Sequence, residues 1–231
     1  MSKALLGLIA LFYITSVVFQ FRGDDVMSLS FSAVIYPLIT LLYFISVKKK
    51  TLFFSLFLVF YSFSELMLFI MDAMTYIYYY LIGNLIIIFA YIFLLIEICK
   101  SISIIDVFKN FKIHIVVLIG LNIYIAYVMQ GVVSPYIEIT NEYIIEISYN
   151  VVLQFLLSLS LLNYLYKDNK KTLFMFIGAL CIVFSEVINM AYLYISNANL
   201  LSVLSTSLCL LGFYFLYQQS KLKHKVEKKS V

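Results

Sequence analysis

The chain contains 231 residues, of which 64% are hydrophobic and 12% are charged. Soluble domains are closer to half apolar and a quarter charged, so this composition excludes an ordinary soluble enzyme and indicates a protein surrounded by lipid. The net charge of +4 comes from lysines between apolar stretches, and we therefore expect membrane lipids as partners and no nucleic acid.

Eight apolar segments follow one another, each long enough to cross about 30 Å of hydrocarbon as a helix. They are continuous rather than alternating, which favours helices over the strands of a barrel. The first segment contains no small-x-small cleavage pattern, so we expect it to stay as a helix rather than be removed as a signal peptide. The predicted fold class is an all-α polytopic membrane protein with spans at residues 4–21, 28–47, 51–71, 76–98, 113–129, 147–166, 172–195 and 199–217.

The lysines divide the connections between these spans into two classes. Fifteen of the 16 basic residues fall in the termini and in alternate connections. The opposite connections contain Arg22 as their sole basic residue, together with six acidic residues. Connections rich in Lys and Arg stay on the cytoplasmic side of a membrane. The sequence therefore predicts a multi-pass protein of the cell membrane with both termini in the cytoplasm.

A repeat relates the two halves of the chain. The segment from Lys49 to Phe53 recurs as residues 170–174, and Phe63-Ser64-Glu65 recurs as Phe184-Ser185-Glu186, both 121 residues later. Eight of the 17 aligned positions from 49 to 65 are identical without a gap, which favours gene duplication. Because four crossings are an even number, the two halves have the same orientation and form parallel repeats.

This repeat divides the chain into four predicted segments. The stretch between the halves mixes apolar residues with lysines, which predicts either a short amphipathic helix along the inner interface or a solvated linker. We expect a first four-helix repeat at 1–99, the cytoplasmic linker at 100–112, a second four-helix repeat at 113–217 and a basic cytoplasmic tail at 218–231.

Glu65 and Glu186 are the clearest ionisable residues inside the predicted spans. Each lies 14 residues beyond the threonine that opens its span, Thr51 or Thr172. At 1.5 Å per residue, this spacing places both carboxyls about 21 Å from the inner boundary, in the outer half of the membrane. A charged residue near the centre of a span costs roughly 2.5–3.5 kcal/mol, so its repetition at equivalent positions indicates a function.

Polar residues at helical spacing accompany the two glutamates. Asn150, Gln154 and Ser158 form a stripe on one face of the sixth span, and others lie on the fourth span or within two turns of a glutamate. We therefore predict a polar cavity between the halves, with both glutamates facing the pseudo-twofold axis. Its expected lining residues are Ser62, Asp72, Asn84, Tyr91, Asn150, Gln154 and Asn189.

Two carboxyls that share such a cavity are suited to acid–base chemistry. They do not both ionise easily at low dielectric, so one would stay protonated as a general acid while the other stabilises positive charge or activates water. Two other interpretations stay open: a non-catalytic subunit in which the pair hydrogen-bonds the halves together, and a small-molecule or proton-coupled transporter or sensor. No cofactor and no metal are expected, because the sequence contains no metal-ligand spacing and no phosphate-binding loop.

Three short motifs resemble the YhhN-like, or lysoplasmalogenase, family of eight-helix membrane proteins. The stretch from Gly178-Ala179 to Ser185-Glu186 resembles the seventh-helix pattern of that family, in which the acidic residue is aspartate. Residues 62–68 resemble the third-helix motif that carries the other family aspartate, and Tyr214 and Gln218 resemble a Tyr and a Gln of the last helix. The chain departs from the family pattern in having glutamate at both acidic positions, Ser64 where a glycine is expected, and no histidine in the fourth span.

The resemblance implies an ether-bond hydrolase that cleaves the vinyl ether of a lysoplasmalogen, a lysophospholipid, into a fatty aldehyde and a glycerophospho-base. It implies Glu65 and Glu186 as catalytic residues and adds Ser185, Tyr214 and Gln218 to the substrate-binding residues. A protonated carboxyl would donate to the vinyl carbon, the other carboxylate would stabilise the oxocarbenium ion, and water would then add. The extra methylene of each glutamate would displace its carboxyl by about 1 Å relative to aspartate, which is enough to alter the rate.

Overall fold

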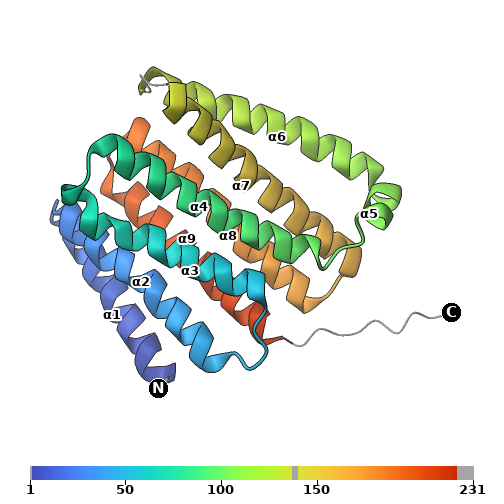
Figure 1. Ribbon diagram of the computed structural model, residues 1–231, viewed down its shortest axis with the longest axis horizontal. Coiled ribbons are helices and arrows are strands. Elements are labelled where there is room, and N and C mark those ends of the chain that lie inside the picture. The colour runs from blue at the N-terminus through green and yellow to red at the C-terminus, as the bar shows by residue number, and fades with distance from the viewer. Residues whose placement is uncertain (1, 137–139, 223–231) are drawn as a thin grey trace.

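A computed structural model describes residues 2–136 and 140–222, without the side chains of residues 2, 72, 104, 140 and 141. Within these ranges the regular structure is entirely helical (Figure 1). Eight helical segments are long and apolar enough to cross a membrane, which confirms the all-α prediction and the number of candidate spans. The long helices are α1 (Ser2–Phe21), α2 (Asp25–Ser46), α3 (Leu52–Leu66), α4 (Tyr76–Cys99), α6 (Lys112–Val133), α7 (Thr140–Lys167), α8 (Lys170–Tyr194) and α9 (Asn199–Lys221). Shorter helical elements lie between them: η1 (Met67–Ala73), α5 (Ile104–Asn110) and η2 (Ser134–Tyr136).

Side-chain caps mark where two of the long helices begin. Asp24 precedes α2 and accepts a hydrogen bond from an amide of the first turn at 3.1 Å. Asn169 precedes α8 and accepts from two amides of its first turn, each at 3.0 Å. These amides have no acceptor inside the helix, so each cap stabilises the helix end. Asn169 thereby defines the start of α8, the helix that carries Glu186.

The third span is not a continuous α-helix. α3 ends at Leu66 and the chain continues as the 3₁₀ helix η1, whereas the repeat-related α8 runs without interruption to Tyr194. The amide that follows Leu66 is shared among three preceding carbonyls, which tightens the last turn. Runs of 3₁₀ helix this long are uncommon, because their hydrogen-bond geometry is poorer than that of an α-helix. Glu65 therefore lies at the end of its α-helix, and Glu186 lies within one.

Helices that are neighbours in the chain mostly pack together as pairs. α1 packs on α2, α3 on α4 and α8 on α9. α4 and α7 also pack together, which joins the segment 1–99 to the segment 113–217. α1 lies at one edge of the bundle and α6 at the opposite edge, where α6 packs mainly on α7 (Figure 1). The buried core is therefore built chiefly from α2, α3, α4, α7, α8 and α9.

Apolar side chains cover the outside of the bundle as well as filling its inside. Phe57, Tyr91 and Phe213 are among the largest side chains with less than 2% exposure. Large hydrophobic side chains are also exposed on all eight long helices, up to 79% for Ile113 on α6. Soluble monomers rarely expose apolar surface on this scale. The distribution is the one expected of a bundle in an apolar solvent.

The predicted linker between the halves contains α5. Val107, on this short helix, is buried, whereas Ile105 is 80% exposed and Phe108 is 59% exposed. Tyr166, near the end of α7, donates a hydrogen bond to Asp106 at 3.2 Å. The segment between the halves therefore contains a short helix, and it is bonded to the second half of the chain.

α8 and α9 approach each other closely at two glycines. A Cβ atom on Gly178 would lie 2.8 Å from the side chain of Leu216, and one on Gly212 would lie 2.9 Å from the backbone oxygen of Gly178. Small residues permit such close crossings between membrane helices. The crossing holds the helix of Glu186 against α9.

We expect Gly212→Ala to lower the free energy of unfolding by about 1–3 kcal/mol, because the added methyl group meets backbone that has no room to move. Gly120→Ala on α6, where nothing lies within 4 Å, is the matched control and should keep or raise stability. Thermal unfolding in detergent, followed by circular dichroism, measures both variants. Equal melting temperatures for the two would contradict the close crossing.

Candidate functional site

Glu65 and Glu186 approach each other from the two halves of the chain. Both side chains are half-buried, and their carboxyls lie within electrostatic range of one another. Glu65 comes from the last turn of α3, and Glu186 comes from the second half of α8. Two acids at repeat-related positions therefore share one neighbourhood in the folded chain.

Two tyrosine hydroxyls surround Glu186. Tyr91 on α4 donates a hydrogen bond to the Oε1 atom of Glu186 at 3.0 Å. The hydroxyl of Tyr149 on α7 also lies within hydrogen-bonding reach of this carboxyl. The rings of the two tyrosines pack together, with 6.0 Å between their centroids. Glu186 is thus bonded from α4 and approached by a second hydroxyl from α7, so both halves of the chain contribute to its surroundings.

Glu65 has a different set of neighbours. Tyr61 lies one turn earlier on α3, and its hydroxyl is within hydrogen-bonding reach of the Glu65 carboxyl. The same hydroxyl lies 3.4 Å from the Sγ atom of Cys209 on α9. Tyr36 on α2 packs against Tyr61 with 4.9 Å between ring centroids, and it lies within electrostatic range of both glutamates.

These seven side chains form one continuous group, which we call the acid–tyrosine cluster. Its members are Glu65, Glu186, Tyr36, Tyr61, Tyr91, Tyr149 and Cys209. Phe57 and Phe213 pack against Tyr61, with their own rings stacked 5.5 Å apart. Within the described residues, no three His, Cys, Asp or Glu side chains are arranged to hold a metal ion. Carboxyls and hydroxyls enclosed by aromatic rings can bind a polar group and exchange protons with it.

Among the predicted lining residues, Tyr91 is in direct contact with a glutamate. The hydroxyl of Ser62 bonds instead with Thr40 on α2, 2.7 Å away. The side-chain amide of Asn84 donates to a backbone carbonyl one turn earlier in α4, at 2.9 Å. Ser62 therefore bonds to a neighbouring helix and Asn84 to its own helix, and these hydrogen bonds do not involve the glutamates.

Three further predicted residues lie close to Glu186 or Glu65 in the chain. Ser185 is buried, and its backbone carbonyl accepts a hydrogen bond from Ser205 on α9 at 3.0 Å. Asn189 is half-buried on α8, one turn beyond Glu186. The side chain of Asp72 lies outside the described part of the structure.

The polar stripe of the sixth span contacts α6. Ser158 exchanges hydrogen bonds with Asn122 of α6, the shorter at 2.9 Å. The amide nitrogen of Gln154 lies 3.8 Å from the sulfur of Met129, also on α6. Asn150 is 1% exposed, and neither atom of its amide has a hydrogen-bond partner among the described residues. The stripe therefore supports the α6–α7 contact, and periodicity identified a real polar face without identifying its neighbour.

Tyr214 and Gln218, the two residues that the resemblance added, both lie on α9. Tyr214 is 48% exposed and lines an apolar groove of about 460 Å³ between α1, α2 and α9. Phe213 lines the same groove and also packs against the acid–tyrosine cluster. Gln218 is half-buried one turn further along α9. Tyr214 therefore lines a groove that lies behind Phe213, and neither Gln218 nor either glutamate is among the residues that line it.

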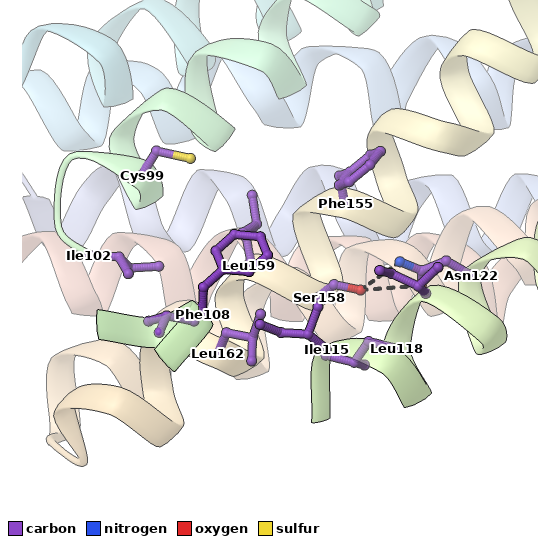
Figure 2. Close-up of a pocket in the computed structure, with 12 residues that line it drawn as sticks. Cys99, Ile102, Phe108, Ile115, Leu118, Asn122, Phe155, Ser158, Leu159 and Leu162 are labelled. Carbon is purple, nitrogen blue, oxygen red and sulfur yellow. Dashed lines mark hydrogen bonds between the residues drawn. The ribbon is translucent and has the colours of Figure 1, made fainter. Parts of the chain in front are cut away.

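A smaller cavity of about 140 Å³ lies beside α5, α6 and α7. Figure 2 shows the hydrogen-bonded pair of Asn122 and Ser158 on its wall, with Cys99 among the other lining residues. The remaining wall is mostly aliphatic and aromatic, and neither Glu65 nor Glu186 contributes to it. This cavity is separate from the acid–tyrosine cluster.

Four members of the cluster were not identified from the sequence: Tyr36, Tyr61, Tyr149 and Cys209. Tyr61 had a usable signal, because it lies four residues before Glu65 and so on the same helix face. Tyr36, Tyr149 and Cys209 had no such signal in the sequence. Tyrosines number 20 and occur along all the spans, so their identity alone does not mark a site.

Comparison with protein-family models, with curated proteins and with solved structures finds no match for this chain. The resemblance to the YhhN-like family therefore stays an expectation that rests on its motifs. The fold and the acid–tyrosine cluster are the observations on which a function can be based.

Removing the Tyr91 hydroxyl should lower the free energy of unfolding by about 1–3 kcal/mol, because a buried carboxyl then loses a hydrogen-bond donor. The control is Tyr214→Phe, which alters a half-exposed side chain and should change stability by less than about 0.5 kcal/mol. Denaturant or thermal unfolding of Tyr91→Phe and Tyr214→Phe in detergent compares them directly. Equal stability of the two variants would mean that the Tyr91 hydroxyl does not support Glu186.

Proposed function

We propose that this chain is a multi-pass membrane hydrolase, in which Glu65 and Glu186 act as a general acid and its partner carboxylate on a lipid substrate. The observation that carries the proposal is the convergence of two repeat-related carboxyls on one enclosed set of tyrosines. Burying two acids among apolar helices is unfavourable, so a site that keeps both has a use for them.

The membrane setting is part of the proposal. The eight apolar helices, the exposed hydrophobic side chains on each of them and the lysines gathered on one side support two parallel four-helix repeats with both termini in the cytoplasm of a cell. In this orientation, Glu65 and Glu186 lie nearer the outer face. A lipid could then reach the cluster from the side without leaving the bilayer.

The chemistry follows from the pair of carboxyls. A protonated carboxyl transfers its proton to the alkene carbon of the vinyl ether that is not bonded to oxygen, and the resulting oxocarbenium ion lies beside the other carboxylate. Water adds to that ion to give a hemiacetal, which separates into a fatty aldehyde and an alcohol. The vinyl ether of a lysoplasmalogen is the bond implied by the resemblance to the YhhN-like family.

The groove behind Phe213 supports a lipid as the substrate. It holds about 460 Å³, and its wall is apolar except for the hydroxyls of Tyr13, Ser207, Tyr214 and Tyr217. Phe213 stands between this groove and Tyr61 of the cluster. An alkyl chain in the groove would therefore lie behind Phe213, whose buried ring separates it from the cluster.

Purified protein in detergent is expected to release aldehyde from a lysoplasmalogen. Glu65→Gln and Glu186→Gln should each reduce that release by about 100-fold or more, because a carboxamide neither donates nor accepts the transferred proton. Glu97→Gln is the matched control: Glu97 lies at the inner end of α4 within electrostatic range of Lys171, and its loss should leave the rate unchanged.

Two outcomes would decide against hydrolysis. Wild-type protein that is folded and releases no aldehyde would exclude this substrate. Release that survives in both glutamine variants would exclude the two carboxyls as the reacting groups.

A proton-coupled transporter or sensor is a second candidate, and a third acid favours it. Tyr80 on α4 donates a hydrogen bond to Glu146 on α7. Glu146 lies within electrostatic range of both Glu142 and Glu186. Glu142, Glu146 and Glu186 thus lie within electrostatic range of one another in succession, from the beginning of α7 to the cluster. Uptake of protons by vesicles that contain the protein, with no aldehyde release, would support this candidate.

The proposed orientation predicts which loops are reachable from outside the cell. In a variant with its three cysteines replaced by alanine, Gly23→Cys should react with a membrane-impermeant maleimide on intact cells. Lys49→Cys should react only after the membrane is opened, because its loop is rich in lysine. The reverse pattern would contradict the orientation.

A further inference from the structure

The two glutamates differ in the number of hydroxyl groups within hydrogen-bonding reach of their carboxyls. Glu186 accepts a hydrogen bond from Tyr91 at 3.0 Å and has the hydroxyl of Tyr149 within reach, so two donors from two helices converge on it. Hydrogen bonds to an ionised carboxylate are stronger than those between neutral groups. Glu186 therefore has more hydroxyl donors for a negative charge than Glu65 has.

Glu65 has fewer hydroxyl groups within reach than Glu186. Its hydroxyl neighbour is Tyr61, from its own helix, and that hydroxyl also contacts the Sγ atom of Cys209 at 3.4 Å. A carboxyl with one hydroxyl donor gains less from ionisation than one with two. Of two neighbouring acids at low dielectric, the one with fewer donors keeps the proton.

The remaining ionisable groups around the pair do not reverse this order. Glu186 faces Glu146 of α7, Tyr36 of α2 and Cys209 of α9, in addition to its two tyrosines. Glu65 faces Glu186, Tyr36, Cys209 and Tyr79 of α4. None of the described groups that act on either carboxyl is basic. Glu146 opposes charge on Glu186, but it does so from a distance, whereas the two hydroxyls are in direct reach.

We propose that Glu65 holds the transferable proton and Glu186 carries the negative charge, with Tyr91 and Tyr149 as positioning residues that maintain this difference. The assignment rests on the proposed hydrolysis for its chemical meaning. Glu65 gives its proton to the vinyl carbon, and the Glu186 carboxylate accepts a proton from the water that attacks the oxocarbenium ion. In the collapse of the hemiacetal, Glu186 returns that proton to the leaving alcohol oxygen while Glu65 takes the hydroxyl proton, so both groups recover their starting states.

Infrared spectroscopy tests the assignment without any substrate, because a protonated carboxyl has a carbonyl band that a carboxylate lacks. In difference spectra against the wild type at neutral pH, Glu65→Gln should remove such a band and Glu186→Gln should not. Loss of the band in Glu186→Gln alone, in both variants or in neither would overturn the assignment. If a glutamine variant does not fold, Glu65→Asp should shift the band and Glu186→Asp should leave it in place.

The role of the tyrosines has its own readout. Adding Tyr91→Phe and Tyr149→Phe to Glu65→Gln removes both donors from Glu186, and a protonated-carboxyl band should return. Adding Tyr214→Phe to Glu65→Gln is the control and should not restore it. A triple variant that still lacks the band would show that the tyrosines do not keep Glu186 ionised.

The infrared result and the activity assay can fail separately. The expected band pattern in a protein that releases no aldehyde would refute the hydrolysis and leave the protonation states as assigned. Aldehyde release that depends on both glutamates, with the reverse band pattern, would refute the assignment and leave the hydrolysis in place.

Discussion

A carboxyl group buried among apolar helices needs hydrogen-bond donors that a bilayer does not provide. In this bundle, the donors are tyrosines. A tyrosine ring fills core volume as phenylalanine does, and its hydroxyl reaches a partner at the far end. Tyr91 is fully buried and still donates to Glu186, so one side chain supplies both packing and polarity. The Tyr91 bond links α4 to α8, and the Tyr149 hydroxyl of α7 lies within reach of the same carboxyl.

The two halves of the chain have similar sequences around their acids and different structures. Glu65 lies where α3 gives way to a 3₁₀ segment, whereas Glu186 lies inside an uninterrupted helix. One acid has a single hydroxyl within reach, and the other has two. The acids lie at matched positions of the sequence repeat, but their surroundings differ. That difference is what the proposed division of roles between the two acids depends on.

Much of the fold was predictable from the sequence, and less of the site was. Apolar segments of sufficient length predict spans because the hydrocarbon thickness sets their length, and all eight candidate spans correspond to helices. The end of α3 at Leu66 was not predictable, because no proline or glycine marks it. The stripe of Asn150, Gln154 and Ser158 was found correctly as one face, but a periodic pattern does not say which helix lies opposite. The acids were predictable as rare charged residues within spans, and Tyr91 was predicted beside them, whereas Tyr36 and Tyr149 were hidden among the 20 tyrosines.

The close crossing of α8 and α9 has a consequence for how the protein is made. Glu186 and the helix that crosses behind it are synthesised after Glu65, which precedes Glu186 by 121 residues. At synthesis rates of about 5–20 residues per second, Glu65 waits roughly 6–24 s before its partner acid exists. During that interval Glu65 has no acidic partner, so a chain interrupted before α8 differs from one that contains both acids.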